Sequence, residues 1–107
     1  MALTRDFKQT VVQRVQRDSA FAKALLDEAA TLFLNGEPET ARMILRDLVN
    51  ATVGFEALAT LTDKPCKSLH RMLSQKGNPS MGNLSAIFDA VRTRLKVRIK
   101  VRTVTAA

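Results

Sequence analysis

The sequence predicts an all-α protein that is mainly helical and ends in one short β-strand. Apolar residues recur every three or four positions over most of the chain, which is the period of a helix with one buried face. The aromatic residues are five Phe, without Trp or Tyr, so the core must be built mainly from aliphatic side chains. Because 107 residues suffice for one hydrophobic core but not for two ordinary domains, we expect a single domain over residues 1–107.

Three helices are expected in residues 1–51, which form an N-terminal helical scaffold. Short polar side chains cap the exposed amides of a helix, proline fits its first turn, and glycine ends it. No catalytic or ligand-binding constellation occurs here, so the expected role is packing or partner contact. The boundary signals are Thr4 for a helix to about Gln16, Asp18-Ser19 and Asn35-Gly36 for the second helix, and Pro38 and Asn50 for the third.

Short helices separated by tight breaks are expected in residues 52–94, a spacing typical of compact DNA-binding modules. Glycine, proline and asparagine mark the breaks, because these residues favour turns over helix. The expected elements are a helix over Phe55–Leu61 begun by Thr52 or Gly54, a turn at Thr62-Asp63-Lys64, a helix from Pro65 to about Ser74, a break at Gly77-Asn78-Pro79, and a helix from Met81 to about Arg92 capped by Ser80.

The first two short helices fit a helix-turn-helix over roughly residues 55–74. Ala59 supplies the small residue that a close helix crossing needs, and Thr62-Asp63-Lys64 supply the tight turn. Apolar residues at helical spacing are expected to face the core, namely Leu58 and Leu61 from the first helix and Leu69, Met72 and Leu73 from the second. The opposite face of the second helix is expected to present Cys66, Lys67, His70, Arg71 and Ser74 to solvent.

Residues 58–91 resemble a known family, and they read LATLTDKPCKSLHRMLSQKGNPSMGNLSAIFDAV. This stretch looks like the lambda-repressor-like segment of the probable addiction module antidote proteins, the HigA-type antitoxins among Xre-type regulators. A leucine-arginine-leucine-serine signature followed by Gly-Asn-Pro is present as Leu69, Arg71, Leu73 and Ser74 before Gly77-Asn78-Pro79. Residues 2–7, 46–47 and 50–55 resemble a longer subgroup of such regulators, so the resemblance covers nearly the whole chain. The chain departs from the family at Asp63, where glycine is usual, and at Lys64, where an apolar residue is usual. Because aspartate tolerates a left-handed backbone better than most residues, the turn implied by the resemblance is still expected at Asp63.

The resemblance implies a recognition helix whose N-terminal residues enter the major groove of operator DNA. Base or phosphate contacts are then expected from Lys67, His70 and Arg71, although an exposed arginine is often only solvated or phosphate-bound. Lys64 is expected to point outward toward a phosphate. The hydroxyls of Ser68 and Ser74 suit phosphate oxygens, with helix capping as the alternative role. The full set of expected contact residues is Lys64, Cys66, Lys67, Ser68, His70, Arg71, Ser74, Lys76 and Asn78, the last two on the loop where such folds hold the DNA backbone.

The positive charge of the chain lies entirely in its second half. The net charge is +7; residues 1–54 hold seven Lys or Arg and seven Asp or Glu, whereas residues 55–107 hold ten and three. Such asymmetry is expected of a surface that binds a polyanion, because each neutralised phosphate releases counterions. A solvated basic surface without a ligand is the alternative.

Residues 95–103 are expected to form a strand with one apolar and one cationic face. A strict period of two predicts this, with Leu95, Val97, Ile99 and Val101 alternating with Lys96, Arg98, Lys100 and Arg102. A lone strand is not stable in water, so it needs the same strand across a dimer or an edge strand of another protein. A frayed basic tail is the alternative.

Together the residues and the resemblance predict a sequence-specific DNA-binding transcriptional repressor that acts as a homodimer on a pseudo-palindromic operator. The resemblance further implies the antitoxin of a type II toxin-antitoxin pair that regulates its own operon, with a RelE-like toxin as partner. Two alternatives stay open. One is a stand-alone regulator without a toxin, and the other is a protein-interaction module with no specific DNA site.

Enzymatic activity, a cofactor and a metal are not expected. No nucleophile lies beside a suitable base, and neither a carboxylate pair nor a glycine-rich phosphate loop occurs in the sequence. One cysteine, Cys66, and one histidine, His70, are too few for a structural zinc site. Without a secretory signal or a long apolar stretch, a cytoplasmic protein with no membrane contact is expected.

Overall fold

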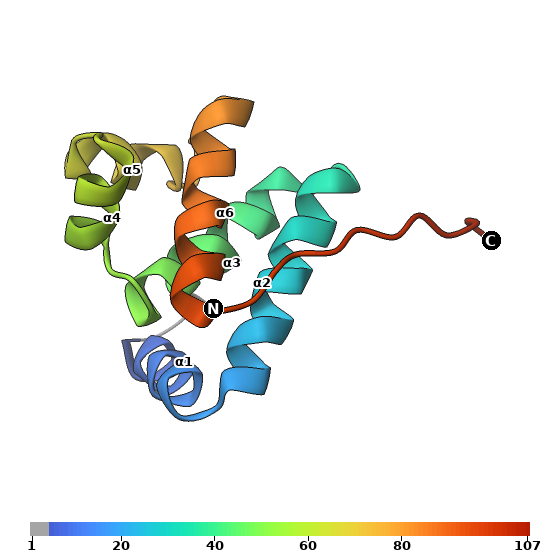
Figure 1. Ribbon diagram of the computed structural model, residues 1–107, viewed down its shortest axis with the longest axis horizontal. Helices are drawn as coiled ribbons and strands as arrows, with labels where there is room; N and C mark the ends of the chain where they lie inside the picture. Colours follow the sequence, from blue (N-terminus) through green and yellow to red (C-terminus); the bar gives the residue numbers. More distant parts are fainter. Residues whose placement is uncertain (1–4) are drawn as a thin grey trace.

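The computed structural model of the protein describes residues 5–107, and in this range it consists of six α-helices (Figure 1). They are α1 (Arg5–Arg17), α2 (Ser19–Leu34), α3 (Pro38–Ala51), α4 (Phe55–Thr62), α5 (Cys66–Met72) and α6 (Met81–Leu95). No strand occurs among residues 5–107. The all-α class predicted from the sequence is therefore confirmed, whereas the cap predicted at Thr4 lies outside the described residues.

Helices α2, α3 and α6 begin where the sequence supplies a capping side chain or a proline. The side chain of Asp18 accepts hydrogen bonds from the backbone amides of Ala20 and Phe21, at 3.1 and 3.2 Å, and so caps α2. Pro38 occupies the first turn of α3. The hydroxyl of Ser80 accepts a hydrogen bond of 3.1 Å from the Asn83 amide and caps α6. All three of these sequence predictions are confirmed.

All six helices contribute to one hydrophobic core. Helices α1, α2 and α3 pack against one another, α2 and α4 both contact α6, and α5 packs on α4. The rings of Phe33 and Phe88 meet edge-on with centroids 5.8 Å apart and join α2 to α6. The largest fully buried side chains are Leu26, Leu45, Leu48, Leu58, Leu69, Leu73, Ile87, Val49 and Val91.

Three features of helices α4, α5 and α6 differ from the sequence predictions. Helix α5 ends at Met72, two residues before the predicted end, and α6 continues to Leu95 instead of ending near Arg92. Leu61 was predicted to face the core, but it is 66% exposed. Helix α4 has eight residues, little more than two turns, so a residue at the edge of its apolar face can turn outward.

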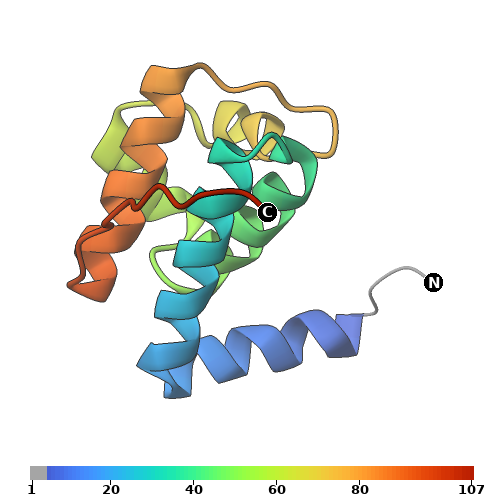
Figure 2. The same ribbon diagram turned by 90° about the vertical axis from the view of Figure 1, so that its right-hand side faces the viewer.

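The strand predicted over residues 95–103 is absent from the single chain. Leu95 is the last residue of α6, and Lys96 ends the helix with a left-handed backbone, φ 60°. Residues 97–107 then run without helix or strand across α2 (Figures 1 and 2) and away from the rest of the chain (Figure 1). The predicted alternation of burial is found in residues 97–100, where Val97 and Ile99 are half-buried and Arg98 and Lys100 are exposed, but it ends at Val101, which is 65% exposed. A strand also requires a hydrogen-bonded neighbour, and residues 5–107 provide none for this segment.

Candidate nucleic-acid interface

A tight turn joins α4 to α5 and determines how the two short helices meet. Asp63 adopts the left-handed conformation predicted for it, φ 54° and ψ 45°. The Ala59 carbonyl accepts hydrogen bonds from the Asp63 amide and, at 3.1 Å, from the Lys64 amide. The chain therefore reverses within a few residues, and Pro65 begins α5 in extended backbone.

The inner side of α5 is fixed by two leucines and one ring stack. Leu69 and Leu73 are buried to 0% and 1% exposure, as their spacing predicted. The imidazole of His70 stacks on the ring of Phe55, with centroids 3.9 Å apart and planes inclined by 19°. Because Phe55 belongs to α4 and is itself buried, this stack holds the α5 surface in register with α4.

The nine predicted contact residues divide into two groups by exposure. The exposed ones are Lys67, His70, Arg71, Lys76 and Asn78, and the half-buried ones are Lys64, Cys66, Ser68 and Ser74. Cys66 was predicted to face solvent, but it packs against the core. The hydroxyl of Ser74 donates a hydrogen bond of 2.7 Å to the Arg71 carbonyl, so it satisfies the end of α5 as the capping alternative anticipated.

Arg42 holds the loop that follows α5, and sequence reasoning missed it. Although charged, Arg42 is only 7% exposed. Its Nε donates to the Ser74 carbonyl at 3.1 Å and its Nη2 to the Gln75 carbonyl at 2.9 Å. The available signal was its register on α3, since Arg42 lies three residues before the buried Leu45 and on the same face. A cation on the buried face of α3 needs a hydrogen-bond acceptor inside the fold.

Gly77 allows the same loop to turn back against α5. A Cβ at this position would overlap the Met72 carbonyl oxygen and would lie 2.6 Å from that of Arg71. The amide of Gly77 donates a hydrogen bond of 3.0 Å to the Ser74 carbonyl. The close approach explains why glycine stands between Lys76 and Asn78, and it brings these two exposed side chains beside the end of α5.

The positive charge of residues 55–107 lies in three places. The first group surrounds α5 and its loops and contains Lys64, Lys67, Arg71 and Lys76. The second lies on the C-terminal segment, which crosses the side of the molecule away from α4 and α5 (Figures 1 and 2). The third lies at the end of α6 and contains Arg92, Arg94 and Lys96. A polyanion bound along α5 would therefore meet the first group and not the second.

Neither a metal-binding cluster nor a membrane span is found among the described residues 5–107. No group of three or more His, Cys, Asp or Glu in this range could hold a metal ion. None of the helices described is both long enough and apolar enough to pass through a membrane. The chain matches no protein-family model, and no curated protein or solved structure matches it either. The interpretation of the surface around α5 therefore depends on its own residues.

Proposed function

We propose that the protein is a sequence-specific DNA-binding transcriptional repressor in which α4 and α5 form a lambda-repressor-like helix-turn-helix. The observation that carries this proposal is the two-sided character of α5. Leu69 and Leu73 fix the helix in the core, while Lys67 and Arg71 remain exposed on a short helix beside a cationic loop. The major groove of B-DNA is about 12 Å wide and admits one α-helix, with cationic side chains reaching base edges and phosphates.

The exposed residues have distinct proposed roles at the DNA. Lys67 and Arg71 contact bases or phosphates from the recognition helix. An arginine that binds guanine through two hydrogen bonds contributes about 1–3 kcal/mol of discrimination between bases. Lys76 and Asn78 bind the phosphate backbone from the loop, where the Arg42 hydrogen bonds and the Gly77 turn hold them. His70 donates a hydrogen bond to the DNA from an imidazole ring that its stack on Phe55 already holds in place.

We propose that the repressor acts as a homodimer, because two copies can bind the two halves of a pseudo-palindromic operator. The α4–α6 groove, a hollow of about 760 Å³ between these helices, is the surface that best fits a second copy. Leu61 projects beside it, and small residues such as Ala57 and Ala90 line it. Asp89 and Arg94 also line it, so two copies related by a two-fold axis can pair opposite charges. Leu61→Asp should give a folded monomer in analytical sedimentation.

The proposed antitoxin activity is supported by the resemblance of residues 58–91 to the addiction module antidote proteins. On this proposal the partner is a RelE-like toxin, bound by the N-terminal helices or by the C-terminal segment. The test is expression of a small protein encoded beside this chain, alone and together with it. Growth arrest that this chain relieves supports the antitoxin, whereas no arrest, or arrest that persists, favours a stand-alone regulator.

Binding to the DNA upstream of its own coding sequence tests the repressor directly. The measurement is fluorescence anisotropy with that duplex and a scrambled duplex at several salt concentrations. Lys67→Ala with Arg71→Ala should weaken specific binding at least about tenfold and lower the salt slope by about two phosphate contacts. Arg17→Ala with Lys23→Ala removes two exposed cations outside α4 and α5 and serves as the charge-matched control.

Two outcomes would contradict the proposal. If the protein binds both duplexes equally, the contact with DNA carries no sequence information, and a protein-interaction module becomes the better interpretation. If the control pair weakens binding as much as the α5 pair does, net charge and not the helix-turn-helix governs the affinity.

A further inference from the structure

The C-terminal segment has an open backbone edge. The amide of Val97 donates a hydrogen bond of 3.0 Å to the Arg92 carbonyl, which closes the end of α6. Beyond it, no backbone hydrogen bond within residues 5–107 involves residues 98–107. The docking edge, as we call residues 97–104, thus offers a row of amides and carbonyls that another extended chain could pair.

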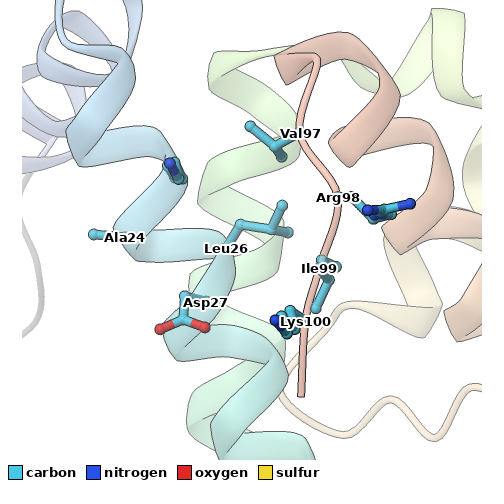
Figure 3. Close-up of a pocket in the computed structure, with 8 residues that line it drawn as sticks. Ala24, Leu26, Asp27, Val97, Arg98, Ile99 and Lys100 are labelled. Carbon is cyan, nitrogen blue, oxygen red and sulfur yellow. The ribbon is translucent and has the colours of Figure 1, made fainter. Parts of the chain in front are cut away.

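The docking edge is held in place from one side. Val97 and Ile99 pack against the core, and Leu26 on α2 points toward the segment while Arg98 points away from α2 (Figure 3). Two hollows lie where the segment crosses α2. The first, of about 300 Å³, is lined by Leu26, Asp27 and residues 97–100, and the second, of about 470 Å³, by residues near the end of α2 and residues 99–104.

Exposed apolar side chains border the second hollow. Leu34 is 60% exposed, Val101 65% and Val104 68%, and all three line this hollow. In a strand, alternate side chains point to opposite faces, so Val101 shares a face with Val97 and Ile99, whereas Val104 shares one with Arg102. A strand laid beside the docking edge could therefore place every second side chain against Leu34 and Val101. The partner therefore needs apolar residues at alternate positions.

The charges on the docking edge define the remaining positions of the partner. Arg98, Lys100 and Arg102 are all exposed and alternate along the segment. If residues 97–104 of two copies paired as antiparallel strands with both apolar faces on the same side, the opposite side would carry six cations, three from each copy. Like charges directly opposite one another on neighbouring strands are destabilising. DNA bound at α5 would lie on the other side of the molecule (Figure 1). An acidic strand would attract these cations, whereas the same segment of a second copy would repel them.

We propose that the docking edge binds an extended segment of another protein that alternates apolar and acidic residues and adds to residues 97–104 as a β-strand. Backbone hydrogen bonds supply affinity, and the cations select acidic sequences. This interaction uses none of the residues assigned to DNA binding. It therefore stands or falls separately from the proposed DNA binding, but it bears on the proposed toxin partner wherever that partner binds the C-terminal segment.

The test uses the full chain labelled with ¹⁵N and a synthetic peptide of about eight residues, alternating Val or Thr with Glu. Binding is followed by amide chemical shifts and by amide hydrogen exchange. The acidic peptide should bind in a saturable manner and slow the hydrogen exchange of the amides in residues 98–104. Its affinity should fall as the salt concentration rises. A peptide with Lys in place of each Glu is the matched control and should bind at least about tenfold more weakly.

Two variants separate backbone pairing from charge. The double variant Val101→Pro with Val104→Pro removes one backbone amide donor from each of the two sides of the extended segment. Both side chains are exposed, and every charge stays in place. This double variant should bind the acidic peptide at least about tenfold more weakly, while the amide chemical shifts of α1 to α6 stay unchanged. The triple change of Arg98, Lys100 and Arg102 to Gln should abolish the preference for acidic over basic peptide.

Three results would overturn the proposal. Equal binding of the acidic and basic peptides, or no binding of either, would show that the segment does not select an acidic strand by its charge. Protection of residues 98–104 that rises with protein concentration in the absence of peptide makes a second copy the occupant. Loss of affinity for a DNA duplex in the triple Gln variant makes the segment a nucleic-acid arm.

Discussion

Replacing Arg42 with Met should weaken the whole fold and the loop after α5 in particular. A hydrogen bond with a charged donor contributes about 1.5–3 kcal/mol, and Arg42 makes two, to the carbonyls of Ser74 and Gln75. Gln75 is exposed, so water can replace its hydrogen bond, whereas Ser74 is half-buried. We therefore expect a loss of about 3 kcal/mol in the free energy of unfolding, or at least about 10 °C in Tm. Methionine preserves the packing of the aliphatic stem.

The assay is urea and thermal unfolding followed by circular dichroism, together with amide exchange of Gly77, whose amide bonds to Ser74. Arg46→Met is the matched control, because Arg46 lies one turn further along α3 and is exposed. It should change stability by no more than about 0.5 kcal/mol. If the two variants lose equal stability, or if Gly77 keeps its exchange rate in Arg42→Met, the two hydrogen bonds do not hold the loop.

The remaining predictions concern the loop, the core and one helix cap. Gly77→Ala should displace the end of α5, because its Cβ would overlap the Met72 carbonyl; heteronuclear NMR should show shifts concentrated around the loop, and an unchanged spectrum would contradict the close approach. Leu69→Ala should cost about 2–5 kcal/mol in urea unfolding, and Leu61→Ala much less in the monomer because Leu61 is 66% exposed; equal losses would refute the burial argument. A hydrogen bond from the Phe21 amide and then one from Arg14 lower the pKa of Asp18 below its ordinary 3.8, so its contribution to stability is present above about pH 4 and is lost as pH falls through the lowered pKa. Asp18→Asn keeps a capping oxygen, and its urea midpoint should therefore fall less than that of the wild type between pH 5 and pH 2, a difference whose absence would count against the cap.

Local chemistry made most helix boundaries predictable. Asp18, Pro38 and Ser80 act on residues within one turn of themselves, so their effect can be derived from neighbouring sequence alone. The left-handed turn at Asp63 followed instead from the resemblance, because glycine is usual at that position and aspartate tolerates the same backbone. Leu69 and Leu73 were also placed correctly, because their spacing allows only one side of a short helix to enter the core.

What could not be predicted depends on residues far apart in the sequence. The partners of Arg42 lie 32 and 33 positions away, and no local pattern identifies them. Leu61 and Cys66 lie near the ends of short helices, where tertiary packing and not periodicity decides which way a side chain turns. The alternation after α6 correctly predicted which side chains of residues 97–100 are half-buried and which are exposed, but strand pairing needs a neighbour that residues 5–107 do not provide.

The stack of His70 on Phe55 gives the protein an internal spectroscopic reporter. The chain has one histidine and neither Trp nor Tyr, so intrinsic fluorescence is of little use and the imidazole protons stand alone in a proton spectrum. Because the two ring centroids are 3.9 Å apart, the ring current of Phe55 must shift those protons strongly. A change in the distance between α4 and α5 would move these signals, and so would a ligand placed against α5. One resonance from unlabelled protein therefore reports both the integrity of the turn at Asp63 and the occupancy of the surface beside it.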